Sequence, residues 1–131
     1  MASKLEKEVE RSILDFLLLY PGKFWKNNSV GVYDARKGVY RKARSVHLIN
    51  GVSDILGVMN GKFIAIEVKS AKGRLSESQK EFLHDIQEEG GIAFVARSIE
   101  DVKRNLEHEA KIYKTRELRK SLSQAEDLPE L

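Results

Sequence analysis

Two acidic side chains and one amine, Asp54, Glu67 and Lys69, are the residues whose types and spacing best suit metal chemistry. The pair Asn60-Gly61 stands between two apolar runs, which is the strongest short-range signal for a two-residue β-hairpin turn. That turn puts Asp54 directly opposite Glu67, and period-2 alternation puts Lys69 on the same face. Opposed carboxylates repel each other, so this arrangement predicts a divalent-metal site beside an amine.

The residues around these acids are mostly apolar on both faces of the hairpin. Such a hairpin is expected to be central in a sheet and covered on both sides. Buried carboxylates resist ionisation unless a cation compensates their charge, which favours the metal interpretation. The alternative is an acid that merely neutralises Lys69, and the residues alone leave both interpretations open.

Length and composition narrow the class of protein. The 131 residues suffice for one domain, and 33% charged with 41% hydrophobic residues is typical of a globular chain. The absence of cysteine excludes disulfides and thiolate chemistry and is compatible with a reducing cytosol. No apolar run approaches the roughly 20 residues of a membrane span, and Leu17-Leu18-Leu19 after a charged start does not indicate a signal peptide.

The apolar pattern predicts an α/β domain with a mixed central sheet flanked by helices. The strand over 92–96 is expected to run parallel to the Glu67 strand through a right-handed crossover. Beyond Lys114 the helical pattern weakens, and residues 124–131 are expected to form a frayed acidic tail. The expected elements are a helix over 5–20, a strand over 24–33, a polar loop or hairpin over 34–44 around Gly38, the central hairpin, a helix over 76–90, a strand over 92–96 and a helix from 99.

Gln79 stands where two roles are open to it. With Ser76 it matches a capping box, in which the glutamine side chain binds the backbone at the helix start. It also stands on the apolar stripe of Phe82, Leu83 and Ile86, which faces the sheet and therefore the candidate site. The residues alone favour the capping role slightly, and one side chain is not expected to fill both roles at once.

Basic residues gather just upstream of the hairpin, with aromatic residues interleaved. Such a cluster suits a phosphate backbone, and aromatic rings between cations can stack on exposed bases. The alternative is a solvated basic loop, but its position beside a candidate metal site favours nucleic acid. We expect His47 to be a loop or substrate contact rather than a metal ligand. The residues expected to contact nucleic acid are Lys26, Arg36, Lys37, Arg41, Lys42, Arg44, Lys72 and Arg74.

The spacing of Asp54 and Glu67-Val68-Lys69 resembles the PD-(D/E)XK nuclease signature. A wider ordered set resembles the VRR-NUC domain, the virus-type replication and repair branch of these nucleases, over about residues 5–102. That set comprises Trp25-Lys26-Asn27-Asn28, residues 51–57, 63–69 and 73–76, Gln79, Gly90-Gly91 and Phe94-Val95. The resemblance implies a restriction-endonuclease-like core within residues 1–115, followed by the helix end and a flexible acidic tail over 116–131.

The resemblance also implies roles for single residues. Asp54 and Glu67 would bind Mg²⁺ or Mn²⁺, with the Val68 carbonyl as a further ligand. Lys69 would position the attacking water and stabilise charge on the phosphate. Gln79 matches the family's helix glutamine, which favours an active-site role.

A glutamate on the first helix often completes the site in this family. Glu6 matches best by its face and by its spacing to Val9, and Glu10 is the alternative. Relatives often carry glycine-rich sequence where this chain has residues 46–50, so substrate contacts there are expected to differ.

The activity implied is metal-dependent hydrolysis of phosphodiester bonds in DNA. Small stand-alone members, found in phages and bacteria, resemble Holliday junction resolvases that act as symmetric dimers. We therefore expect branched DNA as substrate, a homodimer, and the cytoplasm of a bacterial cell or phage-infected host. Two alternatives are a less selective nuclease acting on flaps or ends, and a DNA-binding module that no longer cuts. The presence of all three motif residues, Asp54, Glu67 and Lys69, argues against a binding module that has lost catalysis.

Overall fold

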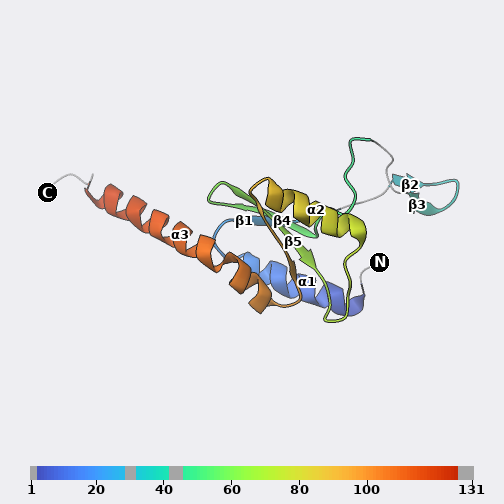
Figure 1. The fold of residues 1–131 in the computed structure, drawn as a ribbon, viewed down its shortest axis with the longest axis horizontal. Coiled ribbons are helices and arrows are strands. Elements are labelled where there is room, and N and C mark those ends of the chain that lie inside the picture. Colours follow the sequence, from blue (N-terminus) through green and yellow to red (C-terminus); the bar gives the residue numbers. More distant parts are fainter. Residues whose placement is uncertain (1–2, 29–31, 42–45, 127–131) are drawn as a thin grey trace.

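A four-stranded mixed sheet forms the centre of the protein, with helices packed on both of its faces (Figure 1). The structure is a computed structural model that describes residues 3–28, 32–41 and 46–126. In chain order the elements are α1 (Lys4–Leu17), β1 (Lys23–Lys26), β2 (Val32–Asp34), β3 (Val39–Arg41), β4 (Ile55–Met59), β5 (Lys62–Val68), α2 (Glu77–Glu88), β6 (Ile92–Ala96) and α3 (Ile99–Glu126). The predicted α/β class with a mixed central sheet is confirmed.

The predicted hairpin is the middle of this sheet, whose strand order is β1-β4-β5-β6. β4 is antiparallel to β1 and β5, and β6 runs parallel to β5 after the crossover through α2. The predicted register is confirmed, because Ile55 pairs with Ile66. Asn60 has φ 54° and Gly61 has φ 76°, the left-handed values that a type I′ turn requires of both central residues.

Different helices cover the two faces of the sheet. One face packs against α1 and the first half of α3, around Ile13, Leu17, Ile55, Met59, Ile64, Ile66, Val68, Phe94, Ala96, Val102 and Leu106. The other face packs against α2 around a smaller cluster of Ala65, Phe82, Leu83 and Ala93. Because side chains alternate along β5, Glu67 shares the α2 face with Ala65.

Short-range signals set the helix boundaries. The Ser3 side chain caps α1 by accepting a 3.0 Å hydrogen bond from the backbone N–H of Glu6. The predicted capping box begins α2, and Gly90, with φ 89°, follows its C-cap. α1 ends at Leu17, three residues before the end predicted from the sequence.

Residues 24–33 are predicted to hold one strand with Asn27-Asn28 as an irregularity, but the structure has two separate strands there, β1 and β2. Only β1 joins the central sheet, and it ends before Asn27, whose backbone N–H donates to the Asp54 carbonyl at 2.8 Å. β2 pairs with β3 in a separate two-stranded sheet, so of the two predicted alternatives around Gly38, a polar loop or a hairpin, the structure has the hairpin. Asn27-Asn28 therefore end one strand rather than interrupt a longer one.

α3 is longer than the apolar pattern indicates. It runs to Glu126, so residues 124–126 of the predicted tail are helical, and the remaining tail residues lie outside the described part. Val102 and Leu106 bury the first half of α3 against the sheet. The second half projects away from the body, at the left of Figure 1.

Candidate active site

The hairpin places Asp54 and Glu67 side by side. Asp54 directly precedes β4, and Glu67 is the penultimate residue of β5. The Oδ2 atom of Asp54 accepts a 2.9 Å hydrogen bond from the backbone N–H of Val68, which fixes the aspartate at the end of the neighbouring strand. Asp54 is half-buried, whereas Glu67 is only 1% exposed. The site is therefore built on two central strands rather than on loops.

Glu67 is held in a position where a lone negative charge is unfavourable. Its pKa is raised from 4.5 to about 9, first by burial and then by Asp54, whereas the Lys69 ammonium lowers it. Its Oε2 atom is buried and has no hydrogen-bond partner among the described residues. A carboxylate in this position needs either a proton or a cation.

Gln79 fills both of the roles that were open to it. Its Oε1 accepts a 2.9 Å hydrogen bond from the backbone N–H of Ser76, which completes the capping box. Its Nε2 donates a 3.0 Å hydrogen bond to Oε1 of Glu67. The expectation that one side chain cannot do both at once was wrong, because the amide oxygen and nitrogen have different partners. The capping bond directs the amide NH₂ towards Glu67 and leaves Oε2 for another ligand.

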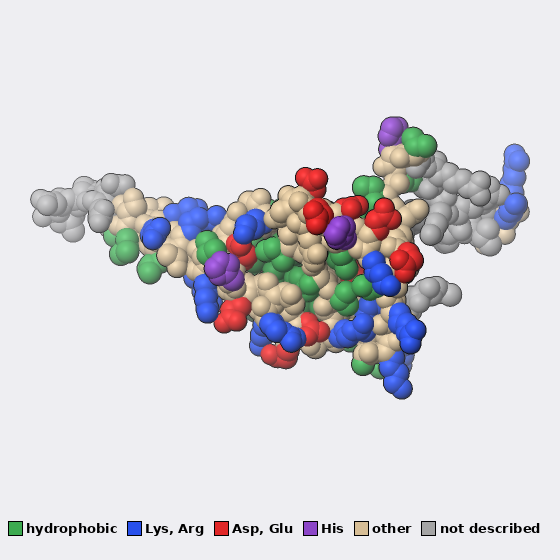
Figure 2. All heavy atoms as spheres, in the orientation of Figure 1, with side chains coloured by type: hydrophobic (Ala, Val, Ile, Leu, Met, Phe, Trp, Pro, Cys, Tyr) green, Lys and Arg blue, Asp and Glu red, His purple; other side chains and the backbone are tan. Residues whose placement is uncertain are grey.

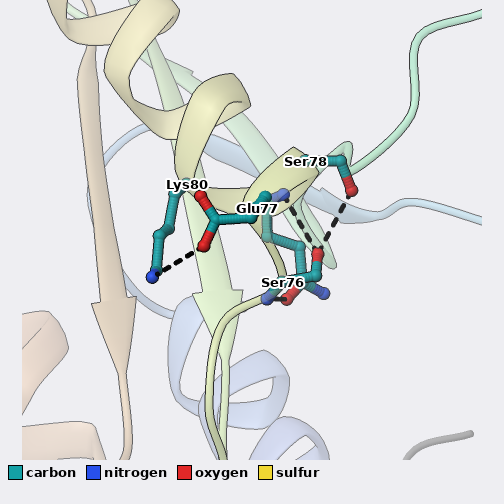
Figure 3. A network of polar contacts seen from close by, with 5 residues as sticks. Ser76, Glu77, Ser78 and Lys80 are labelled. Carbon is teal, nitrogen blue, oxygen red and sulfur yellow. Dashed lines mark hydrogen bonds and ion pairs between the residues drawn. The ribbon is translucent and has the colours of Figure 1, made fainter.

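Hydrogen bonds and an ion pair stabilise the first turn of α2, next to the site. Figure 3 shows the Ser76 hydroxyl bonded at its centre, 3.1 Å from the Ser78 hydroxyl, with Lys80 paired to Glu77 at 3.2 Å. Gly51, with φ 77°, lies against this turn, and a Cβ there would stand 2.3 Å from the carbonyl of Ser78. The segment that leads into β4 therefore contacts α2 at Gly51. Any other residue at this position would have to displace the backbone of the first turn of α2.

Lys69 follows β5 and begins the loop to α2. Its backbone N–H donates to the Ala96 carbonyl at 3.1 Å, which extends the pairing with β6 by one residue. Its side chain is half-buried and passes Gly73, where a Cβ would lie 3.3 Å from the Lys69 Cδ. The amine thus leaves the strand end within electrostatic range of Glu67.

Arg97 holds this loop in place, although no motif or spacing in the sequence marks it. Its Nη1 donates to the carbonyls of Ser70, Ala71 and Gly73, at 3.5 Å for Ala71 and 2.8 Å for Gly73. The backbone N–H of Arg97 donates to Oδ2 of Asp101 at 2.8 Å. The only sequence signal for such a role is the position of Arg97, directly after the strand predicted to lie beside β5.

The predicted role of Glu6 stays a prediction. Glu6 is half-buried in the first turn of α1, and its charge is the smallest of the causes that raise the pKa of Glu67. Over the described ranges, no three His, Cys, Asp or Glu side chains stand close enough together to hold a metal ion. The alternative, Glu10, faces Lys26 at 3.5 Å instead.

Three of the predicted basic contacts are exposed residues on segments next to Asp54 or Lys69 in the fold. Lys72 and Arg74 are exposed on the loop that follows Lys69. Lys26 is exposed at the end of β1, where it pairs with Glu10. Lys26 is followed by Asn27, whose backbone N–H donates to the Asp54 carbonyl, and Lys72 and Arg74 are three and five residues after Lys69.

The upstream basic cluster is only partly within the described residues. Arg36 and Lys37 are exposed at the turn between β2 and β3, which stands apart from the central sheet at the right of Figure 1. The side chain of Arg41 and the whole of Lys42 and Arg44 lie outside the described part. His47 is exposed in the segment that follows.

Comparison with known proteins identifies the family. The VRR-NUC domain profile matches residues 5–100, which is most of the chain. The chain belongs to the VRR-NUC family. A solved structure described as a VRR_NUC domain protein shares the fold, with a TM-score of 0.55 at 17% identity over 85% of this chain and 92% of that one. No curated protein matches the chain.

VRR-NUC membership makes this a nuclease-type, DNA-binding domain with a restriction-endonuclease-like fold, as the sequence motifs predict. None of the described helices combines the length and apolar character that a membrane span requires. The family match ends at residue 100, within the first turn of α3, so almost all of α3 lies beyond it.

Proposed function

We propose that this VRR-NUC protein is an Mg²⁺- or Mn²⁺-dependent DNA endonuclease that hydrolyses phosphodiester bonds in branched DNA such as Holliday junctions. The observation that carries the proposal is the buried Glu67, whose Oε2 has no partner among the described residues and which lies beside Asp54. Two oxygen donors and a nearby ammonium suit a hard divalent ion that also binds phosphate.

The residues present fit such an ion. Asp54 and Glu67 would hold it, with the Val68 carbonyl as the further ligand that we expect. When bound, the ion stabilises negative charge on the phosphoryl oxygens and favours a deprotonated water nucleophile. The N–H of Val68 orients Asp54, and the amide of Gln79 engages one oxygen of Glu67 and leaves the other available.

Lys69 supplies the positive charge that does not depend on the ion. Its ammonium positions the attacking water and stabilises the charge that develops on the phosphate during attack. Arg97 supports this role by fixing the backbone of the loop that begins at Lys69. Lys72 and Arg74 on that loop contact the flanking phosphates, and the more distant cations near β2 and β3 contribute salt-dependent binding.

Branched DNA and a two-fold dimer belong together in this proposal. A symmetric dimer presents two active sites in opposite orientation, as paired cuts in a four-way junction require. We place the protein in the cytoplasm of a bacterial or phage-infected cell, where its DNA substrate lies. Glu6 is assigned a supporting role through its charge on Glu67.

The test is cleavage of a synthetic four-way junction beside a flap, a linear duplex and a single strand, each with Mg²⁺, Mn²⁺ or EDTA. Glu67→Gln and Asp54→Asn remove the proposed ligands. Glu77→Gln is the matched control, because Glu77 is an exposed acid on the nearby first turn of α2. Sedimentation of the same samples gives the oligomeric state.

Paired, symmetric cuts in the junction that are lost in EDTA and in both ligand variants, but kept in Glu77→Gln, would support the proposal. Cleavage of flaps or ends without junction preference would replace it with a less selective repair nuclease. Binding without cleavage in either metal would leave a DNA-binding module on a nuclease fold.

A further inference from the structure

The second half of α3 is a helix that core packing does not explain. Glu109 and Ala110 are the last buried residues along it, Tyr113 and Glu117 are half-buried, and the other side chains over residues 111–125 are exposed. The VRR-NUC match ends at residue 100, well before this segment. An exposed helix of this length needs either internal stabilisation or a partner.

Positive charge dominates this projecting segment. Residues 111–120 contain one acid, Glu117, against five cations, and Figure 2 shows several blue side chains among green and tan atoms on the projecting part at the left. The five cations are Lys111, Lys114, Arg116, Arg119 and Lys120. We call residues 111–120 the basic arm.

Only part of that charge is neutralised within the helix. Lys111 pairs with Glu107 at 3.2 Å and Lys120 with Glu117 at 3.4 Å. Over the described ranges, Lys114, Arg116 and Arg119 form no ion pair with a carboxylate. Arg116 instead lies 5.1 Å from the ring of Tyr113, an interaction that keeps its guanidinium charge available.

The groove at the base of the arm is a weaker candidate for an anion. It has a volume of about 570 Å³ between α1 and α3 and contains Phe16, Tyr20 and Lys103. Glu100 and Glu107 line it as well, and they pair with lysines of the same helix. Lys111 and Lys114 of the basic arm also line the groove, so the positive charge begins at the groove and continues outward along the arm.

The length of α3 from its first residue to the arm is close to one turn of duplex DNA. α3 begins two residues after Arg97, which binds the loop carrying Lys72 and Arg74. At 1.5 Å per residue, Arg119 lies about 30 Å along the helix from its first residue. One turn of B-DNA is about 34 Å long, so a duplex lying along α3 returns its backbone to the arm after one turn.

We propose that the basic arm binds the phosphate backbone of duplex DNA about one helical turn from the scissile phosphate. This inference rests on the proposed nuclease function and names the duplex next to the cleavage site as part of the substrate. Charge complementarity selects DNA over a second copy of the chain, although Leu118 on the arm and Leu122 just beyond it are exposed. Two identical arms in a symmetric contact would bring like charges together.

The test is binding, in EDTA, of junctions whose arms have either about 6 or about 20 base pairs, a choice that brackets one turn of duplex. The wild type should bind the long-armed DNA more tightly. The triple variant Lys114→Gln, Arg116→Gln, Arg119→Gln should lose about tenfold or more in affinity for the long arms alone. The slope of the logarithm of its binding constant against the logarithm of salt concentration should become shallower by about 0.9 for each phosphate that the variant no longer neutralises.

Two further variants keep the result interpretable. Lys114→Arg, Arg116→Lys, Arg119→Lys preserves charge and should bind like the wild type. Glu117→Gln removes the single acid of the arm and should strengthen binding to long arms. Equal binding of both DNAs by the wild type, or an unchanged affinity in the triple glutamine variant, would overturn the proposal.

The remaining outcomes separate the arm from the active site. If Leu118→Gln with Leu122→Gln abolishes a dimer while the triple glutamine variant binds normally, the arm is a contact between copies and the proposal fails. Cleavage of short-armed junctions by the triple variant at the wild-type rate supports an arm separate from catalysis. Absence of cleavage by the wild type refutes the proposed function, while the difference in affinity between long and short arms still tests the arm.

Discussion

Replacing Glu67 by glutamine should stabilise the metal-free protein, and the gain should grow as the pH rises. The folded protein holds a proton on Glu67, whose pKa is raised to about 9, whereas the unfolded chain releases it near pH 4.5. The native state therefore binds more protons than the unfolded state between these values. Stability of the wild type consequently falls with pH across that window.

The magnitude follows from the width of the pH interval. Each pH unit inside the window costs about 1.4 kcal/mol, so the wild type should lose about 3 kcal/mol relative to Glu67→Gln between pH 5.0 and pH 7.5. The neutral amide of the variant takes no part in this titration. Comparing the two proteins at each pH cancels the titration of groups that they share.

The assay is urea unfolding in EDTA, followed by circular dichroism at pH 5.0 and 7.5. Glu109→Gln provides a control of opposite sign. Glu109 is 4% exposed and bonds to Lys62 and to Asn60, and these hydrogen bonds lower its pKa. Its charge contributes stability above pH 4.5 that is lost as the pH falls, so Glu109→Gln should be most destabilising at pH 7.5.

Parallel stability curves for the wild type and Glu67→Gln would refute this reasoning. They would mean that Glu67 ionises in the folded protein without a cation, and that its surroundings already compensate the charge. A gain for Glu67→Gln that shrinks with rising pH would contradict the sign as well as the size.

Three further variants probe the surroundings of the site. Gln79→Ala removes the amide that donates to Glu67 and the oxygen that completes the capping box, so Glu67 loses its orientation and metal affinity should fall about 10- to 100-fold. Arg97→Ala frees the loop carbonyls, and hydrogen exchange over residues 70–74 should speed up together with slower cleavage. Gly51→Ala puts a Cβ 2.3 Å from the Ser78 carbonyl, and thermal melting should show a loss of about 1–3 kcal/mol. Unchanged values in these three measurements would remove Gln79, Arg97 and Gly51, respectively, from the account of the site.

Local signals made the centre of the fold predictable. The Asn60-Gly61 turn fixed the register of β4 and β5, and that register placed Asp54 opposite Glu67. The capping box of Ser76 likewise begins α2 at the expected residue. Each of these features depends on neighbours within a few residues, so a single sequence contains the information.

The features that were not predictable depend on distant contacts. Arg97 bonds to carbonyls 24 to 27 positions away, and their convergence follows from the parallel pairing of β5 and β6. The buried Glu109 lies 49 positions from Asn60, and the apolar pattern gives no sign of their bond.

The length of α3 could not be predicted from the sequence for a different reason. Its outer half buries little apolar surface, so the periodic pattern that marks a packed helix fades there. Ion pairs three and four residues apart, Lys111 with Glu107 and Lys120 with Glu117, support the helix instead.

The central claim is that Asp54 and Glu67 form a divalent-metal site. Titration of Mn²⁺ followed by the electron paramagnetic resonance signal of the free ion tests it most directly, in the wild type, Asp54→Asn, Glu67→Gln and the surface control Glu77→Gln. We predict that the wild type and the control bind Mn²⁺ in competition with Mg²⁺, and that both ligand variants lose at least about tenfold in affinity. Mn²⁺ binding by Glu67→Gln equal to that of the wild type would contradict the account.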